Sequence, residues 1–221
     1  MTRVVDPMLQ DLRETALRMG GRAEAILDKA LRSVAEPNAQ LAREVHDDDV
    51  EIDRLDVEID DKVLKLLALQ APVAGDLREV VAVKMIGSDL ERVGDLSRNI
   101  AQSHARLTLH SGLHLDPGLV GLARETQRLL RKALDSFSAG DADQAREVLA
   151  EDDHIDSEEE RLIALALEEI QARPEDSALA VETILIAKNL ERVADHATNI
   201  AEHVILVAEA RNVKHAAKLA G

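Results

Sequence analysis

The sequence predicts an all-α fold made of two tandem antiparallel three-helix bundles related by internal duplication. Apolar residues recur in steps of three and four along most of the chain, and alternating strand-like runs are nearly missing. The 221 residues include one Phe and no Tyr or Trp, so the core must be aliphatic, which suits helices packed on helices. A long motif also returns after 100 residues.

Three helices are expected in the first half, over about 6–35, 38–70 and 75–108. Asp6 precedes Pro7, and an acid before a proline is typical of a helix start. Pro37 separates the first two helices, and the turn QAPVAG at 70–75 separates the next two.

Three further helices are expected over about 116–138, 141–171 and 176–212. Asp116 precedes Pro117, Gly140 ends one helix, and Asp141 can cap the next. The turn QARPED precedes the last helix. The longer connection LHSGLHLD divides the halves, which predicts domains at 1–110 and 114–215.

The two halves share three landmarks in the same order. DLERVGDLSRNIA at 89–101 returns as NLERVADHATNIA at 189–201, with eight of 13 positions identical. LAREVHDDDVEID at 41–53 resembles QAREVLAEDDHID at 144–156, and the Asp-Pro pairs align as well. These matches indicate tandem duplication of a three-helix unit.

Acidic pairs one helical turn apart recur in the first half. Asp49 and Asp53 flank the core stripe of the second helix, and Glu91 and Asp95 lie roughly opposite that of the third. Asp49 and Asp95 are equally distant from the turn near residue 72, and so are Asp53 and Glu91. We therefore expect the four carboxylates at one height, on an outward face of the hairpin.

The second half repeats this arrangement with Asp152, Asp156, Glu191 and Asp195 around QARPED. Like charges this close repel each other, and a bridging cation would remove the repulsion. Carboxylate oxygens suit Mg²⁺, Mn²⁺, Ca²⁺ or iron, and Zn²⁺ also stays open. A solvated acidic face would explain one such pair, but the coincidence in both repeats favours metal binding.

Polar residues beside the clusters have several interpretations. Asn99 and Asn199 could add an amide oxygen, orient a carboxylate, or simply bond at the surface. His154 replaces Glu51 of the first repeat and neighbours Asp153, so the second site could include a nitrogen ligand. His196 and His203 are interpreted as surface histidines.

Composition restricts the function. The net charge of −16 disfavours nucleic-acid binding. The absence of Cys excludes disulfides, thiolate metal sites and a Cys nucleophile, and is compatible with a reducing cytoplasm. No signal-peptide pattern or bilayer-length apolar segment is present, so any membrane role is expected to be peripheral.

Enzyme alternatives have weaker support. Glu151 and His154 form an E-x-x-H, the spacing of ferritin-like di-metal bundles, but no second copy exists. A phosphotransfer bundle using His46 or His154 is opposed by the acidic surroundings. No phosphate loop or Ser/His/Asp arrangement stands out, so the chain is not expected to be an enzyme.

The stretch LQAPVAGDLREVVAVKMIGSDLERVGDLSRNIA resembles the signature of the PhoU family of phosphate-transport accessory proteins. The resemblance extends to DDDVEIDRLDVEID and ETILIAKNLERVADHATNIAEHV, and so covers nearly the whole chain. It implies tandem three-helix bundles with multinuclear metal clusters on their surfaces. Carried over, the ligands fall on all eight acids named above; His154 and His196 depart from this pattern and leave open whether both sites prefer the same ion.

The resemblance also implies a regulatory role at the cytoplasmic face of the membrane. Such a protein restrains high-affinity uptake by the phosphate ABC transporter and keeps a phosphate-sensing histidine kinase inactive when phosphate is plentiful. The implied partners are the ATPase subunit of that transporter and the kinase, with membrane contact only through them. Both a monomer and a homodimer are open, and the alternative is a di-metal carboxylate enzyme.

Overall fold

The computed structural model describes residues 5–35, 39–107 and 116–214, which contain six α-helices and no strand. The helices are α1 (Asp6–Ala35), α2 (Ala39–Gln70), α3 (Ala74–Leu107), α4 (Pro117–Ala139), α5 (Ala142–Ala172) and α6 (Ser177–Glu209), with a 3₁₀ turn, η1, at Pro174–Asp176. The all-α prediction is confirmed.

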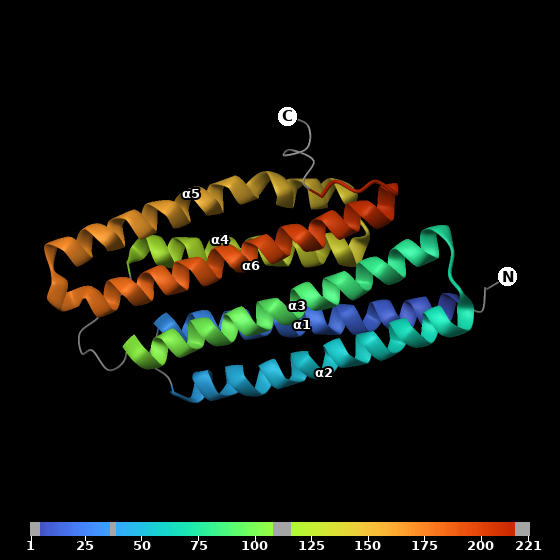
Figure 1. Cartoon of the computed structure of the whole chain (residues 1–221), viewed down its shortest axis with the longest axis horizontal. Helices are drawn as coiled ribbons and strands as arrows, with labels where there is room; N and C mark the ends of the chain where they lie inside the picture. Colours follow the sequence, from blue (N-terminus) through green and yellow to red (C-terminus); the bar gives the residue numbers. More distant parts are fainter. Residues whose placement is uncertain (1–4, 36–38, 108–115, 215–221) are drawn as a thin grey trace.

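The helices form an elongated molecule of two antiparallel triads (Figure 1). α1, α2 and α3 pack on one another, as do α4, α5 and α6. α3 runs along α6 in the middle of the molecule, and α1 also touches α4. The tandem three-helix arrangement is therefore as predicted, and the α3–α6 contact is the main junction between the bundles.

The core is aliphatic, as the composition requires. The predicted stripe of α3 is buried: Val83, Ile86, Leu90, Val93 and Ile100 are each at most 1% exposed. In the stripe predicted on α2, Leu55 is partly buried. The other four members are fully buried: Val45, Ile52, Ile59 and Leu66. Each fully buried side chain of this size contributes about 1.5–3 kcal/mol through removal of apolar surface from water.

The predicted helix ends around α4 and α5 are confirmed in detail. The Asp116 side chain accepts a hydrogen bond from the Gly118 backbone N–H at 2.7 Å. Gly140 adopts the left-handed conformation, with φ of 66°, and closes α4. Asp141 then caps α5 by accepting from the N–H groups of Asp143 and Gln144.

Some boundaries differ from the prediction. α1 keeps its predicted bounds, Asp6–Ala35. α6 ends at Glu209 rather than at 212, because Ala210 takes a left-handed φ of 55° and cannot continue the helix. The breaks predicted at Pro37 and in the connection before Asp116 lie outside the described residues. None of the described helices is long and apolar enough to span a membrane.

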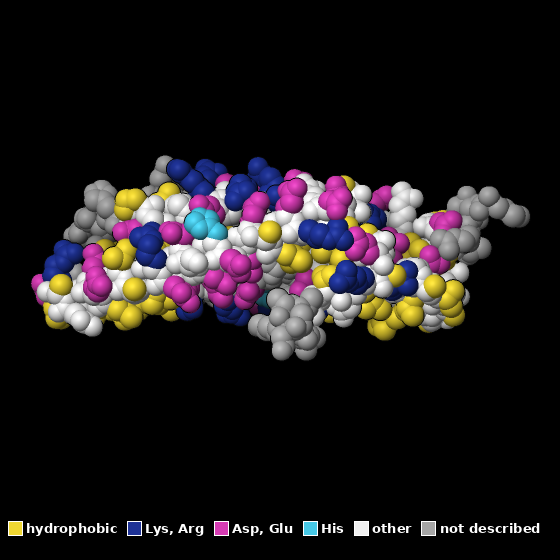
Figure 2. Space-filling model, turned by 90° about the horizontal axis from the view of Figure 1, so that it is seen from above, with side chains coloured by type: hydrophobic (Ala, Val, Ile, Leu, Met, Phe, Trp, Pro, Cys, Tyr) yellow, Lys and Arg dark blue, Asp and Glu magenta, His cyan; other side chains and the backbone are white. Residues whose placement is uncertain are grey.

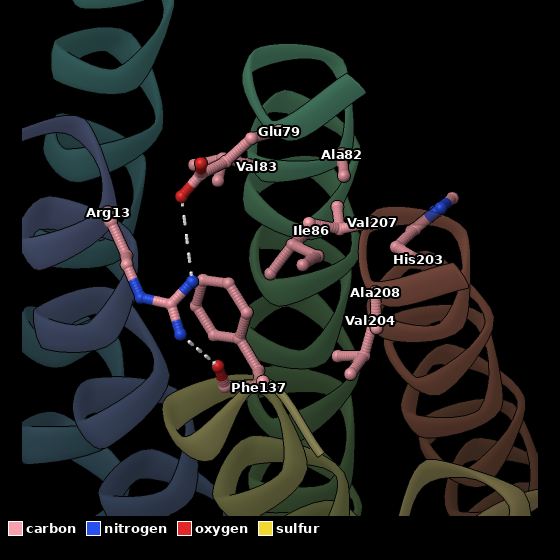
Figure 3. Close-up of a pocket in the computed structure, with 11 residues that line it drawn as sticks. Arg13, Glu79, Ala82, Val83, Ile86, Phe137, His203, Val204, Val207 and Ala208 are labelled. Atoms are coloured by element: carbon pink, nitrogen blue, oxygen red, sulfur yellow. Dashed lines mark hydrogen bonds and ion pairs between the residues drawn. The ribbon is translucent and has the colours of Figure 1, made fainter. Parts of the chain in front are cut away.

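Arg13 of α1 ties the first bundle to the end of α4 (Figure 3). Its Nη2 donates to the Phe137 carbonyl oxygen at 2.6 Å, and its guanidinium lies 5.1 Å from the Phe137 ring centroid. Glu79 of α3 lies 3.6 Å from Nη1. The small cavity beside this contact is lined mainly by aliphatic groups, and none of the eight predicted ligands lines it.

Candidate metal centres

We define the first acidic cluster as Asp49 and Asp53 of α2 with Glu91 and Asp95 of α3. Arg98, one turn beyond Asp95, connects the two helices. Its Nη1 forms an ion pair with Asp49 Oδ2, and its Nη2 donates to Asp95 Oδ1 at 2.6 Å. Asp49 and Asp95 therefore face each other across the hairpin, at the height that their spacing from the turn predicts.

Asp49 is not on an outward face, which corrects the sequence-based expectation. It is 2% exposed, whereas the side chains of Glu91 and Asp95 are 25% and 28% exposed. The close approach of α3 explains the burial. A Cβ placed on Gly94 would lie 3.2 Å from Asp49 Oδ1, so the glycine gives this carboxylate its room.

Charge in the first cluster is partly neutralised from within. Burial raises the pKa of Asp49, as does repulsion from Asp53 and Asp95, while Arg98 opposes the rise. Burial raises the pKa of Glu91, and repulsion from Asp95 adds to the rise. Arg92 opposes this rise, with its Nε 3.3 Å from Glu91 Oε2. The acids thus act on one another electrostatically, as expected for a shared patch.

We define the second acidic cluster as Asp152 and Asp156 of α5 with Glu191 and Asp195 of α6. Burial raises the pKa of Asp152 to about 7, and repulsion from Asp156 and Asp195 adds to the rise. Burial likewise raises the pKa of Asp156 and Glu191, each with a contribution from Asp195. Among the described residues, no arginine forms an ion pair with this cluster to oppose these effects.

One oxygen of the second cluster is buried without a partner. Asp152 Oδ1 is shielded from solvent and accepts no hydrogen bond from any described residue. A buried, unpaired carboxylate oxygen is costly unless a cation or donor reaches it. This oxygen, in an all-carboxylate donor set, fits a hard cation.

The side-chain conformations are not those of a finished metal site. Among the described residues, no group of three or more His, Asp or Glu side chains is close enough together to hold one ion. The helices bring the eight acids into two patches, but their carboxylates would have to rotate to act as joint ligands.

Sequence reasoning missed an ion pair at the edge of the second cluster, in which the carboxylate is buried and the lysine is exposed. Glu159 of α5 is 3% exposed, and Lys188 Nζ lies 2.5 Å from its Oε1. In the first repeat, Asp56 aligns with Glu159 and pairs with Lys84 at 3.2 Å. The offset of 103 that aligns the other acids of this helix would have revealed both residues.

His154 does not join the second cluster. Its Nε2 lies 3.4 Å from Glu125 Oε2, so the ring faces α4 and not α6. Glu151 pairs with Arg128 and Lys132, also on α4. The two residues of the E-x-x-H motif are therefore engaged with α4.

His196 and His203 were predicted to be surface histidines, but both contact α3: His203 is buried and His196 is partly buried. His196 Nδ1 lies 2.9 Å from Oδ1 of Asp89, and His203, which is 5% exposed, places Nε2 3.6 Å from Oδ2 of the same carboxylate. Asn199 donates to Asp89 Oδ1 at 3.2 Å. Asp89 belongs to α3 and the other three to α6, so this polar group lies at the junction of the bundles.

Acidic side chains are prominent on the exterior, in keeping with the net charge of −16. Figure 2 shows them over one long face of the molecule, interspersed with Lys and Arg and bordered by apolar groups near both ends. Apolar side chains exposed to solvent include Leu64, Val73 and Leu167, close to the hairpin turns.

The family model of the PhoU domain matches the chain twice, over residues 16–103 and 119–204. The chain belongs to the PhoU family. Both matched segments carry one acidic cluster and one copy of the long motif. The resemblance inferred from the sequence is thereby confirmed.

Related PhoU proteins match over most of their length. The phosphate-specific transport system accessory protein PhoU homolog of Zymomonas mobilis is 32% identical over 96% of this chain and 89% of that protein. Homolog 1 of Thermotoga maritima is 34% identical over 85% of this chain and 82% of that protein.

The crystal structure of PhoU from Pseudomonas aeruginosa superposes with a TM-score of 0.89 at 29% identity, covering 93% of this chain and 99% of that one. The phosphate transport system regulatory protein PhoU from Streptococcus pneumoniae gives a TM-score of 0.88 at 25% identity, covering 95% and 99%. The PhoU fold thus extends over both bundles.

Proposed function

We propose that this chain is an accessory regulator of a phosphate transport system. It restrains a phosphate ABC transporter through the ATPase subunit and holds a phosphate-sensing histidine kinase inactive, acting as an adaptor on the cytoplasmic side and not as an enzyme. Support comes from its relatives: proteins that match over most of their length carry the description of phosphate-specific transport system accessory proteins.

The proposal includes cation binding by both acidic clusters. The observation that carries it is the repeated set of facing acids, in which Asp152 Oδ1 is buried without a hydrogen-bond partner among the described residues. Asp49, Asp53, Glu91 and Asp95 would hold one set of ions, and Asp152, Asp156, Glu191 and Asp195 the other. A bound ion supplies positive charge that removes the repulsion among the carboxylates and alters the surface offered to partners.

Metal content tests the cation-binding part. Elemental analysis of the purified chain is compared with that of a variant carrying Glu91→Gln, Asp95→Asn, Glu191→Gln and Asp195→Asn. A matched control changes four exposed acids outside the clusters: Glu14, Asp61, Glu168 and Glu175. We expect Mg, Mn, Fe or Zn in the native and control proteins and a strong loss in the cluster variant; no metal in the native chain, or equal metal in all three, contradicts the proposal.

Partner capture tests the adaptor part. The tagged full chain is expected to retain the transporter ATPase subunit and the histidine kinase from extracts of its own cells, and its deletion to raise phosphate uptake when phosphate is plentiful. Failure to retain either partner, together with a redox activity of the purified chain, would favour a di-metal enzyme instead.

A further inference from the structure

The two acidic clusters differ at one decisive position. The repeats align at an offset of 100 in α3 and α6, which pairs Glu91 with Glu191 and Asp95 with Asp195. At the next turn, Arg98 of the first repeat aligns with Thr198 of the second. A cation in one repeat is therefore replaced by a neutral side chain in the other.

Arg98 is built into the first cluster. Its guanidinium contacts one carboxylate from each helix, Asp49 on α2 and Asp95 on α3. Asp49 is 2% exposed, so this ion pair is shielded from solvent on one side and holds its charge in a medium less polar than water. The guanidinium thus occupies the position between the helices that a bridging cation would take.

Thr198 does not bridge the carboxylates of the second cluster as Arg98 bridges those of the first. Its hydroxyl donates to the backbone carbonyl oxygen of Asp195 at 2.8 Å, inside its own helix. Within the described chain, no Lys or Arg forms an ion pair with Asp152, Asp156, Glu191 or Asp195; the nearest such pair is Lys188 with Glu159. The buried Asp152 Oδ1, which accepts no hydrogen bond from a described residue, marks where positive charge is missing.

We infer that Arg98 makes the two sites unequal, so that a hard divalent cation binds the second acidic cluster first and enters the first only by displacing the Arg98 guanidinium. The inference rests on the proposed cation binding and adds an order of occupancy to it. An ion entering the second cluster gains four carboxylates, none of which forms an ion pair with a described Lys or Arg, although Lys188, paired with Glu159, also acts on Glu191. An ion entering the first must break the two charge-assisted contacts of Arg98 and also compete with the exposed Arg92, which pairs with Glu91 and Asp95, before it gains the same kind of ligands.

Titration of the chelator-treated full chain with Mn²⁺ tests this order. Binding is monitored by calorimetry and by the electron paramagnetic resonance signal of the free Mn²⁺. The native chain is expected to show one tight class of sites and a second class at least tenfold weaker. Arg98→Thr should convert the weak class into a tight one, whereas Thr198→Arg should remove the tight class. Arg124→Thr removes an exposed positive charge elsewhere, and Thr198→Val removes only the hydroxyl; both should behave as the native chain does.

Thermal unfolding provides a second readout, because Arg98→Thr leaves Asp49 buried without its partner. Added Mn²⁺ should raise the Tm of this variant more than that of the native chain. Thr198→Arg is expected to stay folded without Mn²⁺, since it adds a counter-charge to an acidic patch, so the test does not depend on one variant.

The two possible failures are distinct. If the native chain, Arg98→Thr and Thr198→Val all bind no Mn²⁺, cation binding itself is wrong, and the order of occupancy with it. If the native chain binds Mn²⁺ but the Arg98 and Thr198 exchanges leave affinity and stoichiometry unchanged, the clusters are equivalent and only the inference about Arg98 is wrong.

Discussion

Asp89 of α3 and His196 of α6 meet across the junction of the two repeats, with 2.9 Å between Oδ1 and Nδ1. His203 approaches the other carboxylate oxygen at 3.6 Å. The residue that aligns with Asp89 in the second repeat is Asn189, whose amide donates to Leu185 within its own helix. The contact is therefore not duplicated. It occurs once, between α3 of the first repeat and α6 of the second, and helps to join the two bundles.

We expect Asp89→Asn to lower the free energy of unfolding at pH 7 by about 1–2 kcal/mol, because the contacts to the buried His203 and the part-buried His196 lose their carboxylate. Burial acts to raise the pKa of Asp89, but the hydrogen bonds and charge interactions with His196 and His203 together outweigh it and lower the pKa below 3.8. A depressed pKa stabilises the fold above the unfolded-state value and loses that effect as the pH falls through the folded-state value.

The difference between native and Asp89→Asn chains should therefore be full at neutral pH and shrink below about pH 4. Urea unfolding at several pH values measures it. Asp61→Asn, at an exposed position, serves as the control and should change little. Equal stability of native and Asp89→Asn chains at pH 7 would show that the junction does not depend on this carboxylate.

The sequence was sufficient for the helices and for the pairing of the acids, because both follow from periods along a single chain. Distance from the turn placed Asp95 opposite Asp49, and Arg98 confirms the pairing by touching both. Burial was not predictable in the same way: Asp49 is covered because Gly94 lets α3 approach, which is a property of packing. His203 was wrongly predicted to be a surface residue for the same reason, because packing against α3 of the other repeat is not visible in the sequence.

Asp49→Asn should destabilise the chain, by about 1–3 kcal/mol, because the loss of its ion pair with Arg98 outweighs the relief of removing a buried charge whose pKa is raised by burial. Chemical denaturation in the presence of a chelator measures the loss. The matched change is Asp53→Asn, one turn away in the same cluster, where the side chain is exposed and forms no ion pair among the described residues. If both variants lose the same stability, the Arg98 contact has no special role.

Asp152→Asn is expected to have the opposite sign. Burial and like-charge repulsion raise the pKa of Asp152 from 3.8 to about 7, so the folded chain holds this proton more tightly than the unfolded chain does. Native stability should then fall as the pH rises from about 4 to about 7. The amide variant avoids that loss and should be more stable at pH 8, by about 1–2 kcal/mol after allowance for solvent screening.

Thermal unfolding in chelator at pH 4 and pH 8 tests this difference. Native and Asp152→Asn chains should have similar Tm values at pH 4 and diverge at pH 8. Asp153→Asn changes the exposed neighbour and should show a much smaller gain. A variant that is less stable than the native chain at pH 8 would mean that the Asp152 carboxylate is structurally required.

Two glycine substitutions separate close packing from helix propensity. Gly94→Ala places a Cβ 3.2 Å from both Asp49 Oδ1 and Ile52 Cδ1, so these side chains must give way by a few tenths of an ångström in a closely packed contact. The strain should outweigh the gain in helix propensity and leave a net loss of about 1 kcal/mol. Gly21 lies exposed within α1, and a Cβ added there would meet no atom within 4 Å, so Gly21→Ala should instead stabilise the chain by about 0.5–1 kcal/mol. Urea midpoints that rise equally for both variants would show that the α2–α3 contact can relax without cost, and that Gly94 is not what buries Asp49.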